Sequence, residues 1–347
     1  MQLEPRPRPP LGVIFDCDMG NAIDDALALS VLYGLDGKNE CRVVSISTSK
    51  PNLRSAAMCE VIGRFYAGAV SGAFSAMGRA LPTGMALKGA LPEDTPMMKA
   101  VLDRTGADGK PVYQHGIEKL VDTAEAEALI RNALTSQYDQ NCVVVITGPA
   151  TNFRKMLDLP GIKELITAKV RTLVIMGGKY PSGGPEYNMK LDIAAAKKLF
   201  AEWPGEIVAS GEELGEQVLF PVEAIETKFA WAANHPTVDA YRAAEKMPYN
   251  AKCYDVTAVL QAVRPKEAYF KLSEPGRIEV MDDGSTKFTA AADGKHRYMM
   301  LDPEKKAAMV EAMVELASAK PVVRVRRFRP QNQQKKDEAK KDEQKKS

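Results

Sequence analysis

The sequence predicts an α/β protein with a mostly parallel central sheet, flanking helices and a helical C-terminal part. Three observations support this fold. Short apolar runs alternate with longer helical segments in the first 220 residues, which is the order that a parallel sheet with crossover helices requires. Polar clusters follow directly after several of the apolar runs. Beyond residue 220 the pattern becomes mainly helical.

The first elements alternate strand and helix. Residues 11–15 are apolar and run into Asp16 and Asp18, as in a buried strand that ends in carboxylates. A strongly helical segment follows at 26–35, a β-like run at 41–48 and a second helix at 53–66. The chain therefore opens in the order β-α-β-α.

The middle of the chain continues this alternation. Further strands are predicted at 142–146, 171–176 and 206–209. The residues 122–125 resemble a capping box and predict a helix that runs to about residue 137. Asp192 and Ser210 are expected to cap the helices that follow them, the first of which covers 193–200.

The C-terminal part is predicted to contain helices at 223–232, 236–246, 255–263 and 303–317. Short β-like runs lie between 269 and 300, and the sequence Asp-Asp-Gly at 282–284 breaks them as a turn. We expect residues 1–10 to be disordered, 11–323 to form a single α/β domain, and 324–347 to be a basic, disordered tail.

Composition and charge exclude several classes of protein. The 347 residues are 45% hydrophobic and 27% charged, as in ordinary globular proteins. The net charge is only +2, and ten Lys and Arg residues fall in the tail from 324 onward, so the remaining body is mildly acidic. We therefore expect no nucleic-acid partner. No apolar run approaches the ~18 residues of a membrane span, so we expect no membrane partner either.

The cysteines and the N-terminus indicate a cytoplasmic protein. Five cysteines are scattered along the chain without a CxxC pair, as expected of free thiols in a reducing compartment. The first residues contain no apolar segment of the secretory type. A cytoplasmic location is therefore predicted.

Ligands of open α/β sheets bind at the carboxyl ends of the strands. Asp16 and Asp18 follow the first predicted strand, Asn52 the second, Thr147 the central one, and a Gly-Gly pair at 177–178 the next. These positions predict one composite site.

Four carboxylates are the strongest local signal. Asp16, Asp18, Asp24 and Asp25 lie within ten residues, between an apolar strand and an apolar helix. Such crowding is unfavourable unless a cation neutralises it, and carboxylate oxygens suit Ca²⁺ or Mg²⁺. A set of acidic residues that caps a helix in water is the alternative. The three histidines form no HxxxH or HxH pair, so zinc is not expected.

The run DCDMGNAIDDALAL at 16–29 resembles the opening motif DxDPGxDDAxAL of the inosine-uridine-preferring nucleoside hydrolase family. Four more stretches are similar to family segments in the same order. ISTSKPN at 46–52 is similar to the second-strand segment that ends in Asn. TGPATN at 147–152 resembles TGPLTN, MGG at 176–178 with EYN at 186–188 resembles MGG…EFN, and YDVTAV at 254–259 matches the place of HDPxAV. The resemblance spans roughly residues 11–320.

This resemblance implies an N-glycosyl hydrolase of the ribosylpyrimidine or purine nucleosidase type, active in nucleoside salvage. Such an enzyme cuts ribonucleosides into free base and ribose, using a Ca²⁺-bound water that an aspartate activates. The implied Ca²⁺ ligands are Asp18, Asp25, Thr147 and Asp255, and Asp18 is also the base. The implied sugar contacts are Asp24, Asn52, Glu186 and Asn188. The family also implies a homo-oligomer, either a dimer or a tetramer.

Three departures from the family pattern fall at the site. Three residues separate Gly20 from Asp24, where the basic motif has one. Tyr254 replaces the histidine that would protonate the departing base, which leaves Tyr254 as the candidate for that role. Tyr180 replaces an asparagine. The last two changes affect the leaving-group side.

Two other functions remain open at this point. A phosphatase of the haloacid dehalogenase type also opens with an apolar strand and a DxD pair, but Gly20 stands where that class has Thr or Val. A non-catalytic nucleoside- or ribose-binding protein would keep Glu186 and Asn188 and could dispense with an acid at Tyr254.

Overall fold

The computed structural model describes residues 9–67 and 81–322. The predicted disordered ends lie outside the described residues, except for Pro9 and Pro10, whose carbonyl oxygens both accept from Asn141 Nδ2 at 3.2 Å. Within the described residues, no helix is long and apolar enough to cross a membrane.

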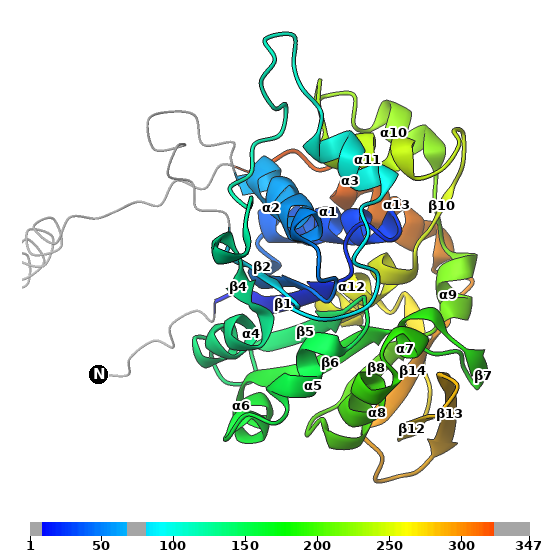
Figure 1. Ribbon diagram of the computed structural model, residues 1–347. Coiled ribbons are helices and arrows are strands. Elements are labelled where there is room, and N and C mark those ends of the chain that lie inside the picture. Colours follow the sequence, from blue (N-terminus) through cyan, green and yellow to red (C-terminus); the bar gives the residue numbers. More distant parts are fainter. Residues whose placement is uncertain (1–8, 68–80, 323–347) are drawn as a thin grey trace, which may run out of the picture.

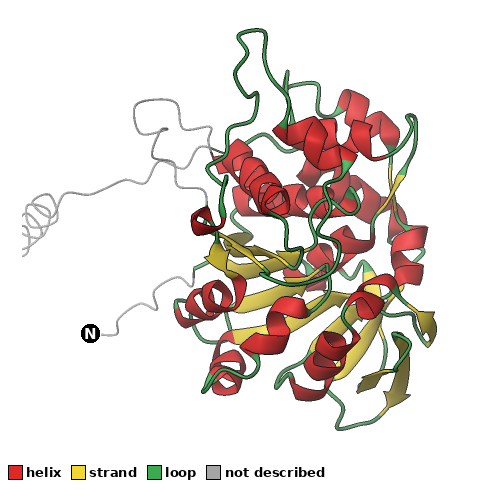
Figure 2. Ribbon diagram, in the orientation of Figure 1, coloured by secondary structure: helices red, strands yellow, loops and turns green. Residues whose placement is uncertain are grey.

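A twelve-stranded sheet runs through the molecule in the order β4-β3-β2-β1-β5-β6-β8-β14-β12-β13-β7, with β11 paired to β14 (Figures 1 and 2). Its first eight strands are parallel. They are β4 (Ala124–Glu125), β3 (Thr83–Met85), β2 (Cys41–Thr48), β1 (Leu11–Cys17), β5 (Cys142–Ile146), β6 (Val170–Met176), β8 (Ile207–Ser210) and β14 (His296–Leu301). The mostly parallel sheet that the sequence predicts is confirmed.

The other strands are antiparallel. β12 (Gly276–Val280), β13 (Ser285–Ala290) and β7 (Ser182–Pro185) extend the sheet at one edge, and β11 (Phe270–Leu272) pairs with β14. The predicted turn joins β12 to β13, where Gly284 has a φ of 83° that favours glycine. A separate two-stranded ribbon pairs β9 (Leu219–Phe220) with β10 (Ala251–Lys252).

Helices cover both faces of the parallel strands (Figure 1). Along β1, Val13 and Phe15 belong to one apolar cluster and Ile14 to the other, because successive side chains of a strand point to opposite faces. The first cluster includes side chains of α1 (Asp24–Gly37), α2 (Leu53–Ala67), α11 (Pro236–Ala244), α12 (Tyr254–Val263) and α13 (Lys306–Ala317). The second includes side chains of α4 (Ala126–Thr135), α5 (Thr151–Met156), α6 (Ile162–Lys169) and α8 (Ile193–Glu202).

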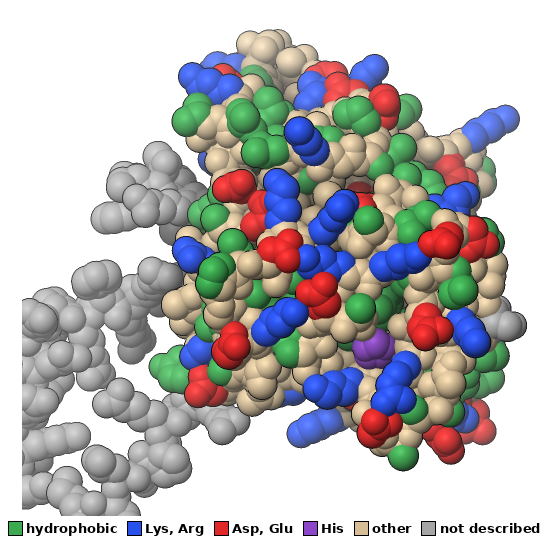
Figure 3. Space-filling model, turned by 60° about the horizontal axis from the view of Figure 1, so that its bottom comes forward, with side chains coloured by type: hydrophobic (Ala, Val, Ile, Leu, Met, Phe, Trp, Pro, Cys, Tyr) green, Lys and Arg blue, Asp and Glu red, His purple; other side chains and the backbone are tan. Residues whose placement is uncertain are grey.

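The remaining helices are short. They are α3 (Pro96–Leu102), α7 (Tyr187–Leu191), α9 (Glu212–Gln217) and α10 (Val222–Thr227), with 3₁₀ turns at Leu120–Asp122 and Pro265–Glu267. The C-terminal part is helical as predicted, and β11 to β14 form where short β-like runs were predicted. All five cysteines are buried. On the face in Figure 3, acidic and basic side chains are intermixed.

Two predicted helix caps are wrong. The carboxylate of Asp122 accepts from the backbone N–H groups of Glu118 and Lys119 and closes a 3₁₀ turn, so α4 begins only at Ala126 and has no side-chain cap. Ser210 Oγ shares a hydrogen bond with Thr257 Oγ1 instead of capping α9. The predicted cap at Asp192 is confirmed, because its side chain accepts from Ala195 N at 3.0 Å.

Candidate active site

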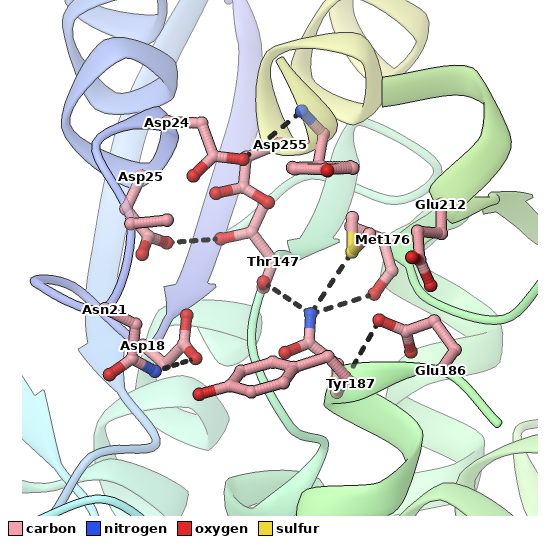
Figure 4. Close-up of a pocket in the computed structure, with 13 residues that line it drawn as sticks. Asp18, Asn21, Asp24, Asp25, Thr147, Met176, Glu186, Tyr187, Glu212 and Asp255 are labelled. Carbon is pink, nitrogen blue, oxygen red and sulfur yellow. Dashed lines mark hydrogen bonds between the residues drawn. The ribbon is translucent and has the colours of Figure 1, made fainter. Parts of the chain in front are cut away.

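A cavity of about 220 Å³ opens at the carboxyl ends of the central strands (Figure 4). Its described lining contains six acidic side chains and no Lys or Arg. The lining residues are Asp18, Asn21, Ala22, Asp24, Asp25, Thr147, Met176, Glu186, Tyr187, Asn188, Glu212, Tyr254 and Asp255.

These residues come from segments far apart in the sequence. Asp18 follows β1, Thr147 follows β5, and Met176 ends β6. Asp24 and Asp25 begin α1, Glu186 is the N-cap residue of α7, and Tyr254 begins α12. The parallel strands end at the same edge of the sheet, so they bring these segments together.

The turn after β5 allows the strand ends to approach closely. Thr147 N donates to Asp16 O at 2.8 Å. A Cβ on the next residue, Gly148, would lie 2.8 Å from both Asp18 N and Ser49 Oγ, which is closer than real side chains come. A glycine is therefore needed beside Asp18.

Four carboxyl groups form the acidic side of the cavity. Asp18, Asp24, Asp25 and Asp255 are all less than 7% exposed. Burial raises the pKa of Asp24 to about 7, and the charge of Asp18 adds to the shift. Burial and the charges of neighbouring aspartates raise the pKa of Asp25 and of Asp255 well above the usual range. Four ionised aspartates without a neutralising cation would therefore be unfavourable in this site.

Neighbouring polar groups orient these carboxylates. Thr147 Oγ1 donates to Asp25 Oδ1 at 3.0 Å, and the backbone N–H of Tyr254 donates to Asp24 Oδ2 at 3.2 Å. Asn21 Nδ2 donates to Asp18 Oδ2. Figure 4 shows Asn21 directly beside Asp18 and the side chain of Thr147 pointing at Asp25.

Glu186 and Asn188 form the opposite wall. Glu186 caps α7 by accepting from the backbone N–H groups of Asn188 and Met189, each at 3.0 Å, and it also accepts from Gly178 N at 3.2 Å. Burial raises the pKa of Glu186, and these hydrogen bonds act against that shift. Asn188 Nδ2 donates to Thr147 O at 2.9 Å, which joins this wall to the acidic side.

The chemistry of this donor set fits a hard cation. Within the described residues, no three His, Cys, Asp or Glu side chains are already arranged as the ligands of a metal ion. The charges of these aspartates instead act on one another and raise the pKa values of Asp24, Asp25 and Asp255. A divalent cation held by the same carboxylate oxygens would neutralise this excess negative charge.

The structure brings together eight of the nine predicted site residues. Asp18, Asp24, Asp25, Thr147, Glu186, Asn188, Tyr254 and Asp255 all line the cavity. Asn52 does not line it. The Oδ1 of Asn52 accepts from the backbone N–H groups of Arg54 and Ser55 at the start of α2, and its Nδ2 donates to Pro92 O at 2.7 Å and to Asp94 Oδ1 at 3.0 Å.

Sequence reasoning missed six residues at or beside the cavity. Five of them line it, and Lys50 lies behind Asn21. The five are Asn21, Ala22, Met176, Tyr187 and Glu212. Asn21 and Lys50 lie in the loops after β1 and β2, within motifs that were singled out for neighbouring residues. Their place after these strands could have indicated that they lie near the site, although not which contacts they make. Glu212 follows β8 without any comparable motif, and only the fold places it at the cavity.

Comparison with known proteins identifies the class. Residues 13–324 match the family of inosine-uridine preferring nucleoside hydrolases. A search of curated proteins by sequence found no match. This chain therefore combines a mostly parallel α/β fold, a carboxylate-lined cavity at the strand ends and a family match over most of its length. The chain belongs to the inosine-uridine preferring nucleoside hydrolase family, and it is an N-glycosyl hydrolase.

Solved structures show the same fold. A plant nucleoside hydrolase is 18% identical and aligns with a TM-score of 0.62 over 90% of this chain and 100% of its own. The inosine-uridine preferring nucleoside hydrolase of Bacillus anthracis is 16% identical, with a TM-score of 0.60 over 89% of this chain and 99% of its own. An inosine-guanosine nucleoside hydrolase is 17% identical, with a TM-score of 0.64 over 88% and 98% of the two chains.

Proposed function

We propose that this chain hydrolyses the N-glycosidic bond of ribonucleosides and releases a free base and ribose. The observation that supports this most is the cavity itself, where four buried aspartates face Glu186 and Asn188. The bond between ribose and base breaks through a state in which positive charge develops on the sugar ring. Carboxylates held around the ring stabilise that charge without having to reorganise.

Asp18 is proposed as the base that accepts a proton from the attacking water. It follows β1 directly, lines the cavity, and is held at Oδ2 by the amide of Asn21. This bond leaves the other carboxylate oxygen, Oδ1, as the acceptor for a proton. A well-placed general base contributes typically 10²- to 10⁴-fold to the rate.

Asp24, Glu186 and Asn188 are proposed as the groups that bind the ribose hydroxyls. Asp24 and Glu186 are acceptors on opposite sides of the cavity, and Asn188 is held by Thr147 O. Asn52, which the resemblance also implied, is left out because its side chain is occupied at the start of α2.

The proposed metal is Ca²⁺, with Asp18, Asp25, Asp255 and the main-chain carbonyl of Thr147 as ligands. Three carboxylates and a carbonyl oxygen are the donors that Ca²⁺ prefers. When bound, the ion would orient the ribose hydroxyls and lower the pKa of the attacking water.

The side of the site that would face the departing base lacks a good proton donor. Tyr254 lies there in place of a histidine, and burial raises the pKa of its hydroxyl above the usual value. A phenol with a raised pKa is a poor acid near neutral pH. We therefore propose that stabilisation of the sugar dominates catalysis, and that Tyr254 contacts the base more than it protonates it.

The assembly and location remain predictions. A dimer or tetramer and a role in nucleoside salvage follow from the family resemblance alone. A cytoplasmic location follows from the scattered cysteines, none of which lies in a CxxC pair.

A reducing-sugar assay tests the proposal. Purified protein is incubated with inosine, uridine, guanosine, adenosine and cytidine, with and without a chelator, and released ribose is measured. We expect ribose from at least one nucleoside and a strong loss in chelator. Binding of nucleosides without any ribose would support the binding-protein alternative, and phosphate release from sugar phosphates without ribose from nucleosides would support the phosphatase alternative.

A further inference from the structure

We propose that Lys50 and Asn21 form a positioning pair that fixes the carboxylate of Asp18 for catalysis. Lys50 fixes the amide of Asn21, and that amide fixes Asp18. This inference rests on the proposed function, in which Asp18 is the base.

Lys50 is a buried lysine immediately behind the cavity. It lies two residues after the end of β2, and only 2% of the residue is exposed. Its Nζ donates to Asn21 Oδ1 at 2.9 Å. A buried ammonium group is unfavourable unless opposite charges face it. The carboxylates of Asp18 and Asp25 do so, and they partly offset the lowering of the Lys50 pKa by burial.

Asn21 connects this lysine to the base. Its Nδ2 donates to Asp18 Oδ2, and its backbone N–H donates to Asp18 O at 3.3 Å. Asn21 belongs to the three residues that separate Gly20 from Asp24, where this chain departs from the shorter family motif. That longer segment supplies the side chain that contacts Asp18.

The order of donors and acceptors explains why a lysine stands at this position. An asparagine amide can turn over and exchange its oxygen and nitrogen, but a lysine ammonium has only donors. The Lys50 ammonium therefore holds the oxygen of Asn21, which directs the amide nitrogen toward Asp18. In the reversed orientation, the amide oxygen would face the carboxylate and repel it.

A fixed carboxylate matters for the rate more than for substrate binding. Displacing a reacting group by about 1 Å can reduce a rate by about 10²-fold. Loss of either member of the pair should therefore lower kcat and leave KM nearly unchanged. If Lys50 instead acted on the site by its charge alone, its effect would persist in the absence of Asn21.

A double-mutant cycle tests the pair in the full-length protein. Lys50→Met keeps most of the buried stem, Asn21→Ala removes the amide from a partly exposed loop, and the third variant carries both. Lys169→Met is the matched control, because Lys169 is partly buried, pairs with Asp139 and lies at the amino end of β6, away from the cavity. Ribose release gives kcat and KM, and thermal unfolding checks that each variant is folded.

We expect each single variant to lower kcat by about 10- to 100-fold, with KM within about threefold. The double variant should lie within about threefold of the poorer single variant, because both changes break the same chain of contacts. Lys169→Met should match wild type.

A kcat of either single variant within about threefold of wild type would overturn the pair. So would losses that multiply in the double variant. If Lys50→Met does not fold, Asn21→Ala alone decides, because unchanged activity in that variant removes the link to Asp18. Wild-type protein that releases no ribose overturns the proposed function and the pair with it, whereas active wild type with unaffected variants overturns only the pair.

Discussion

Replacing Asp18 by Asn should separate activity from stability. Asparagine has nearly the same shape and can still present an oxygen to Asn21 Nδ2. Its other atom, which would face the cavity, then becomes an amide nitrogen that donates and cannot accept a proton. We expect kcat to fall by about 10²- to 10⁴-fold, as for loss of a general base.

The same substitution should stabilise the metal-free protein. The charge of Asp18 contributes to the raised pKa of Asp24, Asp25 and Asp255. A carboxyl group whose pKa is raised by folding costs stability once the pH exceeds its unfolded value, because the folded state must give up a proton that it holds more tightly. For each of these groups, every pKa unit by which the substitution lowers the raised pKa should add about 1.4 kcal/mol to the free energy of unfolding at pH 8.

The two effects are measured on the same preparations. Ribose release gives kcat, and urea unfolding in chelator at pH 8 gives the free energy of unfolding. Asp158→Asn is the control, because its carboxylate is 68% exposed and pairs only with Lys198 among the described residues; it should leave both quantities unchanged. Asp18→Asn with activity within about threefold of wild type would refute the assignment of the base, and a less stable variant would refute the electrostatic reasoning.

Three other predictions follow from the site. Dialysed protein should contain about one Ca²⁺ per chain, and Asp255→Ala should lose it; elemental analysis that finds stoichiometric zinc and no calcium would contradict this. Burial raises the pKa of Asp16 to about 7, so in chelator its contribution to stability should fall between about pH 4 and pH 7, and Asp16→Asn should flatten the pH dependence of urea unfolding; parallel curves for the two proteins would be evidence against it. Tyr254→Phe should slow hydrolysis of inosine more than of p-nitrophenyl riboside, which needs no acid, and wild type should prefer the activated substrate; equal wild-type kcat/KM for both would mean that an effective acid is present.

Continuous apolar runs made the central strands predictable. β1, β5 and the part of β6 from 173 to 176 are buried on both faces, so each contains a continuous hydrophobic run bounded by polar residues. β7 has the sequence SGGP, which carries no strand pattern, and it forms only because β13 pairs with it. The capping pattern at 122–125 failed because Asp122 had nearer backbone donors in its own turn.

Three of the four carboxylates on the acidic side of the site were predictable because they cluster in one motif after one strand. Asp24 and Asp25 follow Asp18 within seven residues, and helix α1 fixes their direction. The contacts of Asn52 and Lys50 were not predictable, since they depend on which of two neighbouring side chains turns toward the cavity. The side chain of Asn52 donates to Pro92 O and Asp94 Oδ1 in a neighbouring loop, whereas Lys50 donates to Asn21 Oδ1 beside the cavity.

Product analysis in ¹⁸O-labelled water tests the central claim most directly. Hydrolysis predicts one free base and one ribose for each nucleoside consumed, with the label at C1 of the ribose and no requirement for phosphate. Ribose 1-phosphate formed only when phosphate is added, or nucleoside that binds and is never consumed, would contradict the account.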